Sequence, residues 1–469
     1  MNLSNRLKPC SWEKLLMVLM AIISQPLLVD SQNASFVRGA DGSLLDEVEQ
    51  SGGIFYDNGE AKDAYAIFRD NGINNIRLKL WHTPEEPYNG LGRVLAMAER
   101  AADLGLGITI DFHFSDTWAD PGHQTKPAAW DDLSYALLTD SIRQYTRNVI
   151  GLLKQQNTLP QYVQIGNEIN CGMLWNDGRV CNPYDTEAQW NKLGGLIKNA
   201  IQGVKEALLP DENVGIIIHF GDGGNNGACR WFFDHIASQN IDYDIIGLSF
   251  YPWWHGTFNI LQYNLDDLAD RYDKDLMVME TGYPFTLSWN DNTNNIVGLS
   301  EQLMEGYPAT VDGQYRYIRD LILLVKGTSG GKGKGVFYWS PEWISAPGLG
   351  SPWENVALFD FENEVLSSII AFHENTGVPE PGNEPFGLVS YPNPFHEKTE
   401  IRFHLNTPSK VKLSIFDAVG RQVKSWPEKD RPAGLNRIPW HAGGLPPGSY
   451  TLHLKVGSAM INRVMLKTE

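Results

Sequence analysis

Two glutamates stand at equivalent places in the chain, each at the end of a short apolar run. Glu168 closes the run YVQIGNE, and Glu280 closes the run DLMVME. Both runs are β-prone and nearly free of charge, as expected for parallel strands that are buried on both faces. One such glutamate is most simply explained by an ion pair with a nearby cation, but two in matched contexts favour a catalytic pair. Paired carboxylates can cleave a glycosidic bond, with one acting as an acid and the other as a nucleophile or base.

The residues near these glutamates suit a sugar-binding site. Asn167 directly precedes Glu168, and its amide can hydrogen-bond a sugar hydroxyl. Arg77 ends another apolar run and could hold Glu280 ionised, although a purely structural ion pair is the alternative. The ends of further apolar runs are polar and aromatic, as a polysaccharide groove requires, although any single Trp among them is more often a packing residue. These further candidates are Asp41, Trp81, His113, Asp116, Trp118, Tyr251, Trp254 and Trp339.

The elements that must position these side chains alternate regularly along the chain. Amphipathic stretches at helical spacing, such as 61–72, 93–105 and 187–208, separate the apolar runs. Strands that alternate with helices predict a parallel sheet, and eight such units predict a closed (β/α)8 TIM barrel over residues 35–377. No glycine-rich phosphate-binding signature follows any of the runs. The eight predicted strands start at Phe36, Asn74, Gly107, Tyr162, Val214, Ile245, Leu276 and Gly335.

The pattern changes after a Pro- and Gly-containing stretch at 378–387, which we interpret as a linker. Residues 388–469 contain strictly alternating runs around Phe403, Leu413 and Leu454, which predict a small antiparallel β-sandwich domain. This region carries 12 Lys and Arg against 6 Asp and Glu, so its net charge is +6 while the whole chain carries −18. Two modules with different partners are therefore expected.

The N-terminal residues 1–34 resemble a secretory signal peptide. Arg6, Lys8 and Lys14 precede the apolar run LLMVLMAII, which is too short to span a bilayer. Removal of this segment would leave Cys171, Cys181 and Cys229, so at least one cysteine has no partner within the chain. An exported protein permits a disulfide between Cys171 and Cys181, and the sequence leaves this pairing open.

Composition limits the range of partners. The 469 residues are 42% hydrophobic and 20% charged, which is ordinary for a soluble globular protein. The net charge of −18 argues against nucleic acid, whose phosphates require a basic surface. A neutral substrate fits better, and the 15 Trp residues provide flat faces that either fill cores or stack on sugar rings.

Several long motifs identify a family resemblance. The runs NNIRLKLW, DFHFSDTWADPGHQTKPAAW, IGNEIN, LSFYPWWHG, METGYPF and GVFYWSPEWI, between Phe36 and Phe372, closely resemble glycoside hydrolase family 53, the endo-β-1,4-galactanases. The resemblance implies a retaining barrel enzyme with Glu168 as acid/base and Glu280 as nucleophile. The implied substrate is the β-1,4-galactan of pectic arabinogalactan type I.

The same resemblance raises the question of a metal. Some bacterial members hold a structural calcium ion in the loop after the seventh strand, and the matching residues here are Asp291, Thr293 and Asn295. Trp289 stands where the first acidic ligand is expected, and Thr293 replaces a histidine. Because a hard cation needs several carboxylate or carbonyl oxygens, an Asn-rich turn without metal is the alternative. The resemblance implies no cofactor that catalysis would require.

The C-terminal region has a resemblance of its own. The runs SYPNPF from Ser390, VKLSIFDAVGRQV from Val411 and GLPPGSYTLHL from Gly444 resemble a type IX secretion sorting domain. This implies the type IX secretion machinery as a partner and a secreted or cell-surface location. A carbohydrate-binding module is the alternative, although only Trp426 and Trp440 are candidate stacking residues. The protein is expected to be a monomer.

The same sequence features are compatible with two other functions. Another endoglycanase with the same carboxylate pair, such as a mannanase or xylanase, would differ only in the sugar that it accepts. The second is a different class of protein, a noncatalytic glycan-binding barrel on the cell surface. The presence of both Glu168 and Glu280 weighs against it, because binding alone needs neither an acid nor a nucleophile.

Overall fold

The computed structural model describes residues 36–373 without a gap and most of the region from 388 to 468. The predicted signal peptide 1–34 and all of the predicted linker 378–387 except Phe386 lie outside the described residues. Within the described ranges, no helix is both long enough and apolar enough to cross a membrane.

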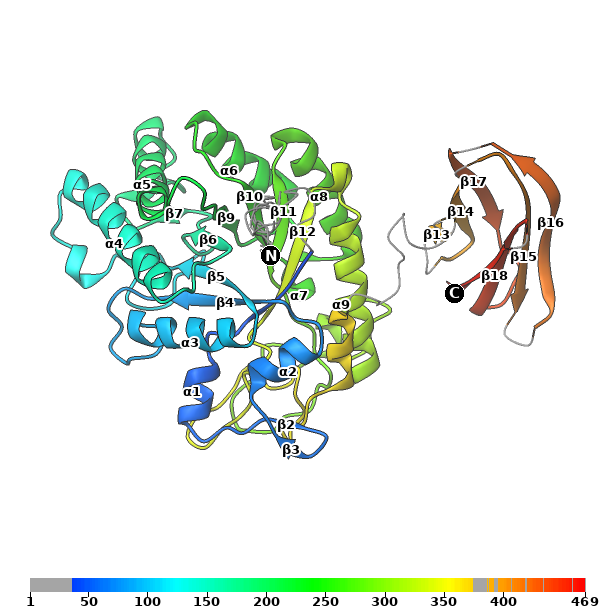
Figure 1. The fold of residues 1–469 in the computed structure, drawn as a ribbon, viewed down its shortest axis with the longest axis horizontal. Helices are drawn as coiled ribbons and strands as arrows, with labels where there is room; N and C mark the ends of the chain where they lie inside the picture. Colours follow the sequence, from blue (N-terminus) through cyan, green and yellow to red (C-terminus); the bar gives the residue numbers. More distant parts are fainter. Residues whose placement is uncertain are drawn as a thin grey trace, which may run out of the picture.

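Eight parallel strands close into a barrel, as the alternation in the sequence predicts (Figure 1). Each strand of this barrel corresponds to one of the eight predicted runs. Around the barrel, the strands follow the order β1, β12, β11, β10, β9, β6, β5 and β4, and β4 pairs with β1. Their bounds are Val37–Asp41 (β1), Asn75–Leu80 (β4), Gly107–Phe112 (β5), Tyr162–Ile165 (β6), Gly215–Phe220 (β9), Ile245–Ser249 (β10), Asp275–Glu280 (β11) and Gly333–Trp339 (β12).

The barrel strands are buried along nearly their whole length because helices cover them outside and side chains fill them inside. A small apolar cluster, separate from the main core, fills part of the interior. Gly39 of β1 makes room for it, since a Cβ at this position would lie 2.1 Å from the ring of Phe337. The cluster consists of Val37, Ile217, Ile245, Met277, Met279 and Phe337.

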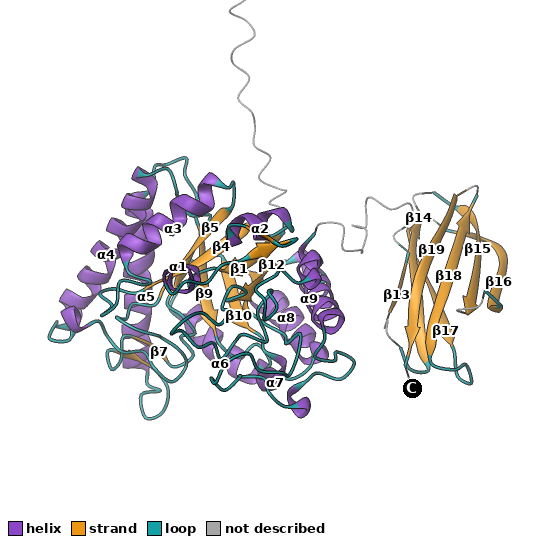
Figure 2. Cartoon of the chain, turned by 90° about the horizontal axis from the view of Figure 1, so that it is seen from below, coloured by secondary structure: helices purple, strands orange, loops and turns teal. Residues whose placement is uncertain are grey.

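Helices surround the strands, as Figure 2 shows. Side chains at the N-caps fix the start of five of them, because Asp63, Ser134, Thr186, Asn225 and Thr310 each accept a hydrogen bond from a backbone N–H of the first turn. The α-helices are Leu45–Gln50 (α1), Ala64–Asp70 (α2), Leu91–Asp103 (α3), Tyr135–Gln155 (α4), Glu187–Ala207 (α5), Asn226–Ser238 (α6), Pro252–His255 (α7), Phe258–Tyr272 (α8) and Val311–Lys326 (α9). Two short hairpins lie in the loops: β2 (Tyr56–Asp57) with β3 (Glu60–Ala61), and β7 (Gly172–Met173) with β8 (Gly178–Arg179).

The C-terminal region forms two antiparallel sheets, which confirms the predicted β-sandwich. One sheet has the order β13 (Val389–Tyr391), β14 (Lys398–Leu405) and β17 (Gly434–His441). The other has the order β16 (Gln422–Arg431), β15 (Ser409–Asp417), β18 (Gly448–Val456) and β19 (Ala459–Lys467). Phe403, Leu413 and Leu454 belong to its core. Trp440 is also buried there, against Phe395 and Tyr450, so it is not available to stack on a sugar.

Candidate active site

The candidate site is a cavity of about 510 Å³ at the C-terminal mouth of the barrel. Ten of the twelve residues predicted to be catalytic or to bind substrate line it. Parallel strands all end at this mouth, so residues far apart in the sequence meet there. The ten are Asp41, Arg77, His113, Trp118, Asn167, Glu168, Tyr251, Trp254, Glu280 and Trp339.

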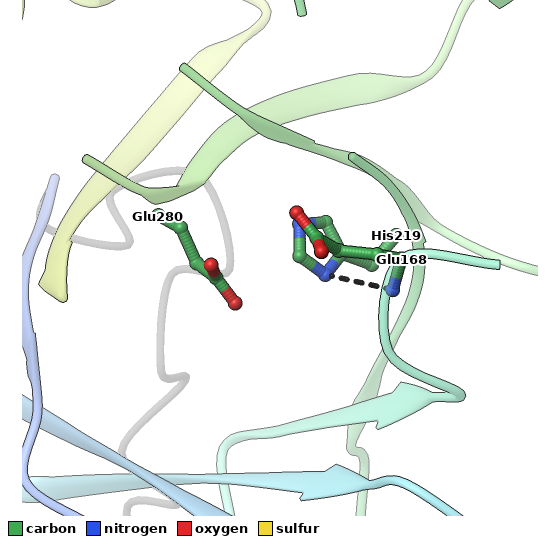
Figure 3. Close-up of side chains that lie close together, drawn as sticks. All are labelled: Glu168, His219 and Glu280. Atoms are coloured by element: carbon green, nitrogen blue, oxygen red, sulfur yellow. Dashed lines mark hydrogen bonds between the residues drawn. The ribbon is translucent and has the colours of Figure 1, made fainter. Parts of the chain in front are cut away.

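Glu168 and Glu280 face each other across this cavity (Figure 3). Glu280 is the last residue of β11, and Glu168 lies in the turn after β6. Glu168 has a left-handed backbone with φ of 45°, a conformation that is costly for a residue with a side chain and that gathers at functional sites. One carboxylate oxygen of Glu168, one of Glu280 and a ring nitrogen of His219 all lie within 4.8 Å of one another. Inverting glycosidases separate their carboxyl groups by about 6.5–9.5 Å and retaining enzymes by about 5–5.5 Å, so carboxylate oxygens this close favour the retaining class.

Arg77 holds Glu280 in place. Its Nη2 lies 3.1 Å from Oε1 of Glu280 and 2.9 Å from Oδ2 of Asp111, while its Nη1 lies 2.6 Å from Oδ2 of Asp41. Tyr251 Oη donates to Oε2 of Glu280 over 3.1 Å. Burial raises the pKa of the Glu280 carboxyl above its usual 4.5, and the Arg77 guanidinium opposes that rise.

Glu168 has a different environment. Its Oε1 accepts a hydrogen bond of 2.6 Å from Ser249 Oγ, and it has no ion pair within the described residues. Gly221 gives the carboxyl its space, since a Cβ there would lie 2.8 Å from the Glu168 carboxyl carbon. Burial, and then the neighbouring charge of Glu280, raise the pKa of Glu168 well above its usual value. Because the cation sits beside Glu280, Glu280 ionises first and Glu168 keeps the proton.

A polar network behind the pair fixes these orientations. Arg77 Nη2 donates to Asn167 Oδ1 over 2.8 Å, and Asn167 Nδ2 donates to the Ala119 carbonyl over 2.8 Å. His219 Nε2 lies 3.0 Å from Ser249 Oγ. Burial, followed by the charge of Arg77, lowers the pKa of His219 well below its usual value, so the ring stays neutral. A neutral ring protonated on Nε2 donates to Ser249, whose own proton is then free for Glu168.

Aromatic side chains form the walls of the cavity. Trp118 is 37% exposed and Trp254 is 60% exposed, so both offer ring faces to a ligand. Trp339, at the end of β12, contacts Trp118 with ring centroids 6.0 Å apart and Trp353 at 4.8 Å. Flat apolar faces beside carboxylates and amides are suited to binding a sugar.

Two of the predicted substrate-binding residues do not line the cavity. The carboxylate of Asp116 accepts hydrogen bonds from the backbone N–H groups of Thr83 and Ala128, so it joins two loops. Trp81 lies behind the wall, where its Nε1 donates to His113 Nδ1 over 3.2 Å and its ring meets the edge of Trp118. Both follow strand ends, but being near a strand end does not tell whether a side chain points into the mouth.

The sequence did not lead us to predict a role for Gln164, His219 or Ser249. Gln164 Nε2 donates to Asp111 Oδ1, and its Oε1 accepts from Arg77 Nε. All three are buried polar residues within strands β6, β9 and β10. Polar residues inside otherwise apolar runs are the signal that could have found them, since a buried polar group needs a partner.

The loop that carries Asp291, Thr293 and Asn295 is held together by hydrogen bonds. Asp291 Oδ1 accepts from the Thr293 N–H, and its Oδ2 accepts from Ser345 Oγ and the Ser351 N–H. Asn295 Nδ2 donates to the Ser288 carbonyl. Since protein donors already engage both oxygens of the one carboxylate in the set, these residues do not fit a calcium ion well. Calcium binding here stays a prediction, and no catalytic step depends on it.

The cysteines follow one of the open possibilities. Cys171 and Cys181 form a disulfide, and Cys229 is buried with a free thiol. The bridge closes the loop that directly follows Glu168. In that loop, the Trp175 N–H donates to the Gln124 carbonyl, and Gln124 Nε2 donates to the carbonyl of Asn167. The disulfide loop therefore supports the backbone that presents Glu168.

Comparison with known proteins agrees with this site. Residues 37–372 match the model of glycosyl hydrolase family 53, and residues 389–467 match a secretion system C-terminal sorting domain. An uncharacterised protein of Niallia circulans is 43% identical, covering 72% of this chain and 93% of its own. An arabinogalactan endo-β-1,4-galactanase of Thermothelomyces thermophilus is 34% identical, and the match covers 71% of this chain and 98% of that enzyme. The family 53 catalytic domain of Ignisphaera aggregans has a solved structure that matches with a TM-score of 0.67 and 38% identity. The match covers 73% of this chain and 97% of that domain.

The barrel and its paired carboxylates define a glycoside hydrolase. More particularly, the chain belongs to glycosyl hydrolase family 53, with a C-terminal sorting domain of a secretion system. The sorting domain indicates secretion or display at the cell surface.

Proposed function

We propose that this protein is a secreted retaining endo-β-1,4-galactanase that cleaves the galactan side chains of pectic arabinogalactan type I. The observation that carries the proposal is that one carboxylate oxygen of Glu168 and one of Glu280 lie within 4.8 Å of each other in a cavity walled by Trp rings. Membership of family 53 and the similarity to the arabinogalactan endo-β-1,4-galactanase of Thermothelomyces thermophilus support the substrate.

In the first step, a Glu280 oxygen attacks the anomeric carbon while Glu168 donates its proton to the leaving oxygen. The carbon–oxygen bond to the leaving sugar breaks, and a covalent glycosyl ester on Glu280 forms. In the second step, Glu168 removes a proton from water, which attacks the same carbon and releases Glu280. Two inversions give a product with the starting configuration. Asn167, beside the pair, would hydrogen-bond a hydroxyl of the reacting sugar.

Export of the protein is proposed to use two signals in the chain. We infer that residues 1–34 direct the first export step and that the C-terminal domain is read by type IX secretion machinery. The sorting-domain match over 389–467 supports this inference. We expect the protein to act as a monomer.

Product analysis tests the substrate. We expect the protein to release short galacto-oligosaccharides from potato-type galactan and to leave β-mannan and xylan intact. Cleavage of mannan or xylan in preference to galactan would favour the alternative of another endoglycanase. Binding of galactan without any product would favour a noncatalytic binding barrel.

Azide rescue tests the mechanism. We expect Glu280→Ala to lose turnover on galactan, because no group remains to form the covalent ester. Azide should fill the space of the missing carboxylate and yield a glycosyl azide of inverted configuration, detectable by nuclear magnetic resonance. Unchanged turnover in Glu280→Ala would remove this residue from the reaction.

A further inference from the structure

One cationic group in the cavity wall has no role in the mechanism above. Lys79 lies on β4 two residues after Arg77, so both side chains project from the same face of the strand into the barrel. Its side chain lines the cavity but is only 2% exposed. Among the described residues, Lys79 Nζ has no hydrogen-bond partner.

The surroundings of Lys79 hold its ammonium group without pairing it. Nζ lies 3.6 Å from the centroid of the Trp118 ring and 5.6 Å from that of Trp81. Asp41 and Glu342 are near enough to act on its charge, but Asp41 pairs with Arg77 and Glu342 accepts from the Leu44 N–H. Arg77 and Asp111 also act on its charge, and so does Glu47 of α1.

Such a group costs folding free energy. Burial lowers the pKa of Lys79 from 10.5 to about 8, and the nearby acids only partly offset this. The unfolded chain therefore binds more protons than the folded one between these pKa values. It follows that the Lys79 charge destabilises the fold below pH 8 and that this penalty fades as the pH rises towards 10.5. A buried donor without a partner that faces a cavity is readily explained by a ligand.

The barrel order tells which part of a substrate would meet Lys79. Ser249, at the end of β10, holds the Glu168 carboxyl, so the leaving sugar departs on that side of the cavity. β4 lies opposite β10 in the closed order of eight strands. Lys79 therefore faces the sugar whose anomeric carbon is attacked, or the next sugar on that side.

We propose that Lys79 donates hydrogen bonds to hydroxyl oxygens of the glycone part of the substrate and so contributes to its binding and selection. This rests on the proposed function and names a binding group for the same site. Trp343 Nε1, another buried donor that has no partner in the described ranges and whose side chain lines the cavity, extends this donor surface. A neutral sugar is the fitting ligand, because Asp41 and Glu280 already line the same cavity and would repel an acidic one.

Binding and stability together test the proposal. The parent is the full chain with Glu280→Gln, which cannot turn over, and the ligand is β-1,4-galactotetraose in isothermal titration calorimetry. We expect Lys79→Met to weaken binding about 10- to 100-fold, as for the loss of a charged hydrogen bond. The same variant should melt at the same or a higher temperature than its parent, because the unpaired charge is gone. Lys79→Arg should recover part of the affinity.

Lys274→Met is the matched control, since Lys274 also faces an aromatic ring, Tyr243, but lies outside the cavity. The Lys274→Met variant should bind β-1,4-galactotetraose with the affinity of the parent. Binding by Lys79→Met as tight as that of the parent would overturn the proposal, and so would a loss of affinity accompanied by a lower melting temperature, which marks a packing residue.

The two proposals fail in different ways. If the parent binds mannotetraose or xylotetraose in place of galactotetraose, the proposed substrate is wrong, and Lys79→Met is compared on the sugar that binds. If the parent binds none of the three, both proposals are overturned.

Discussion

At the scale of single residues, two glutamates with the same functional group differ in their neighbours. Glu280 lies against Arg77 and Tyr251, whereas Glu168 receives its hydrogen bond from Ser249. The carboxylate nearest the guanidinium bears the charge more readily, and the other retains a proton at higher pH. This difference supports the proposed division of roles between nucleophile and acid.

The same difference predicts the pH dependence. Burial raises the pKa of Glu280 from 4.5 to about 7, so the acid limb of kcat/KM should lie well above pH 4.5. Loss of the Glu168 proton should set the alkaline limb, because burial and the charge of Glu280 raise the pKa of Glu168 well above its usual value. In Glu168→Gln, measured on an activated aryl β-1,4-galactobioside, the alkaline limb should vanish while the acid limb remains. Turnover of galactan by this variant should fall about 10²–10⁴-fold, because the polymer needs the proton. An unchanged alkaline limb would show that another group sets it.

The sequence predicts the two glutamates and the ion pair of Arg77 with Glu280, but not the side chains that hold Glu168. Glu168 and Glu280 are recognisable because each ends an apolar run of its own. The hydrogen bond from Ser249 to Glu168 joins β10 to the turn after β6, and His219 reaches Ser249 from β9, which lies between these two strands. Such partners depend on which strands become neighbours when the barrel closes, which local sequence does not state. The sequence also does not show that Trp81 lies outside the cavity lining, since its position one layer behind Trp118 is set by packing.

At the scale of elements, the loops after the strands bring the site together. The strands themselves are predictable, because runs of buried apolar residues bounded by turns leave little choice of structure. The conformation of the loop after β6 is not predictable in this way, because its support comes from Gln124 in another loop and from the bridge of Cys171 to Cys181. Pairing of cysteines needs their separation in space, and the Cα atoms lie 4.9 Å apart.

Removal of this bridge should destabilise the barrel. The double variant Cys171→Ser/Cys181→Ser frees a loop closed over 10 residues, and we expect a loss of about 2–3 kcal/mol in the free energy of unfolding. Calorimetry with and without dithiothreitol measures it. The reductant should lower the melting temperature of the natural protein and leave the double variant unaffected. Because Cys229 is present in both proteins, a reductant effect that persists in the variant would point to that thiol and away from the bridge.

At the scale of the whole molecule, the main hydrophobic core of the barrel region and that of the C-terminal region share no residue. One is built from the barrel and its helices, and the other from the two sheets of the C-terminal region. Their charges also differ in sign, since residues 388–469 carry +6 within a chain of −18. Matches to two separate family models fall on the same two regions. A hydrolase followed by a sorting domain needs the second region for export, whereas the reaction uses side chains of the first alone.

This division predicts that residues 35–377 form an active enzyme without the rest of the chain. All residues that line the cavity lie between Asp41 and Trp353, and the barrel buries its own core, so the shorter chain should fold by itself. We expect its kcat and KM on galactan to equal those of the full chain, and calorimetry should show one unfolding transition where the full chain shows two. Residues 388–469 expressed alone should fold as well, without hydrolysing galactan, because neither glutamate is present. Aggregation of the shorter chain, or a marked fall in its kcat, would mean that the C-terminal region contributes to the catalytic fold, and the boundary at 378–387 would then be wrong.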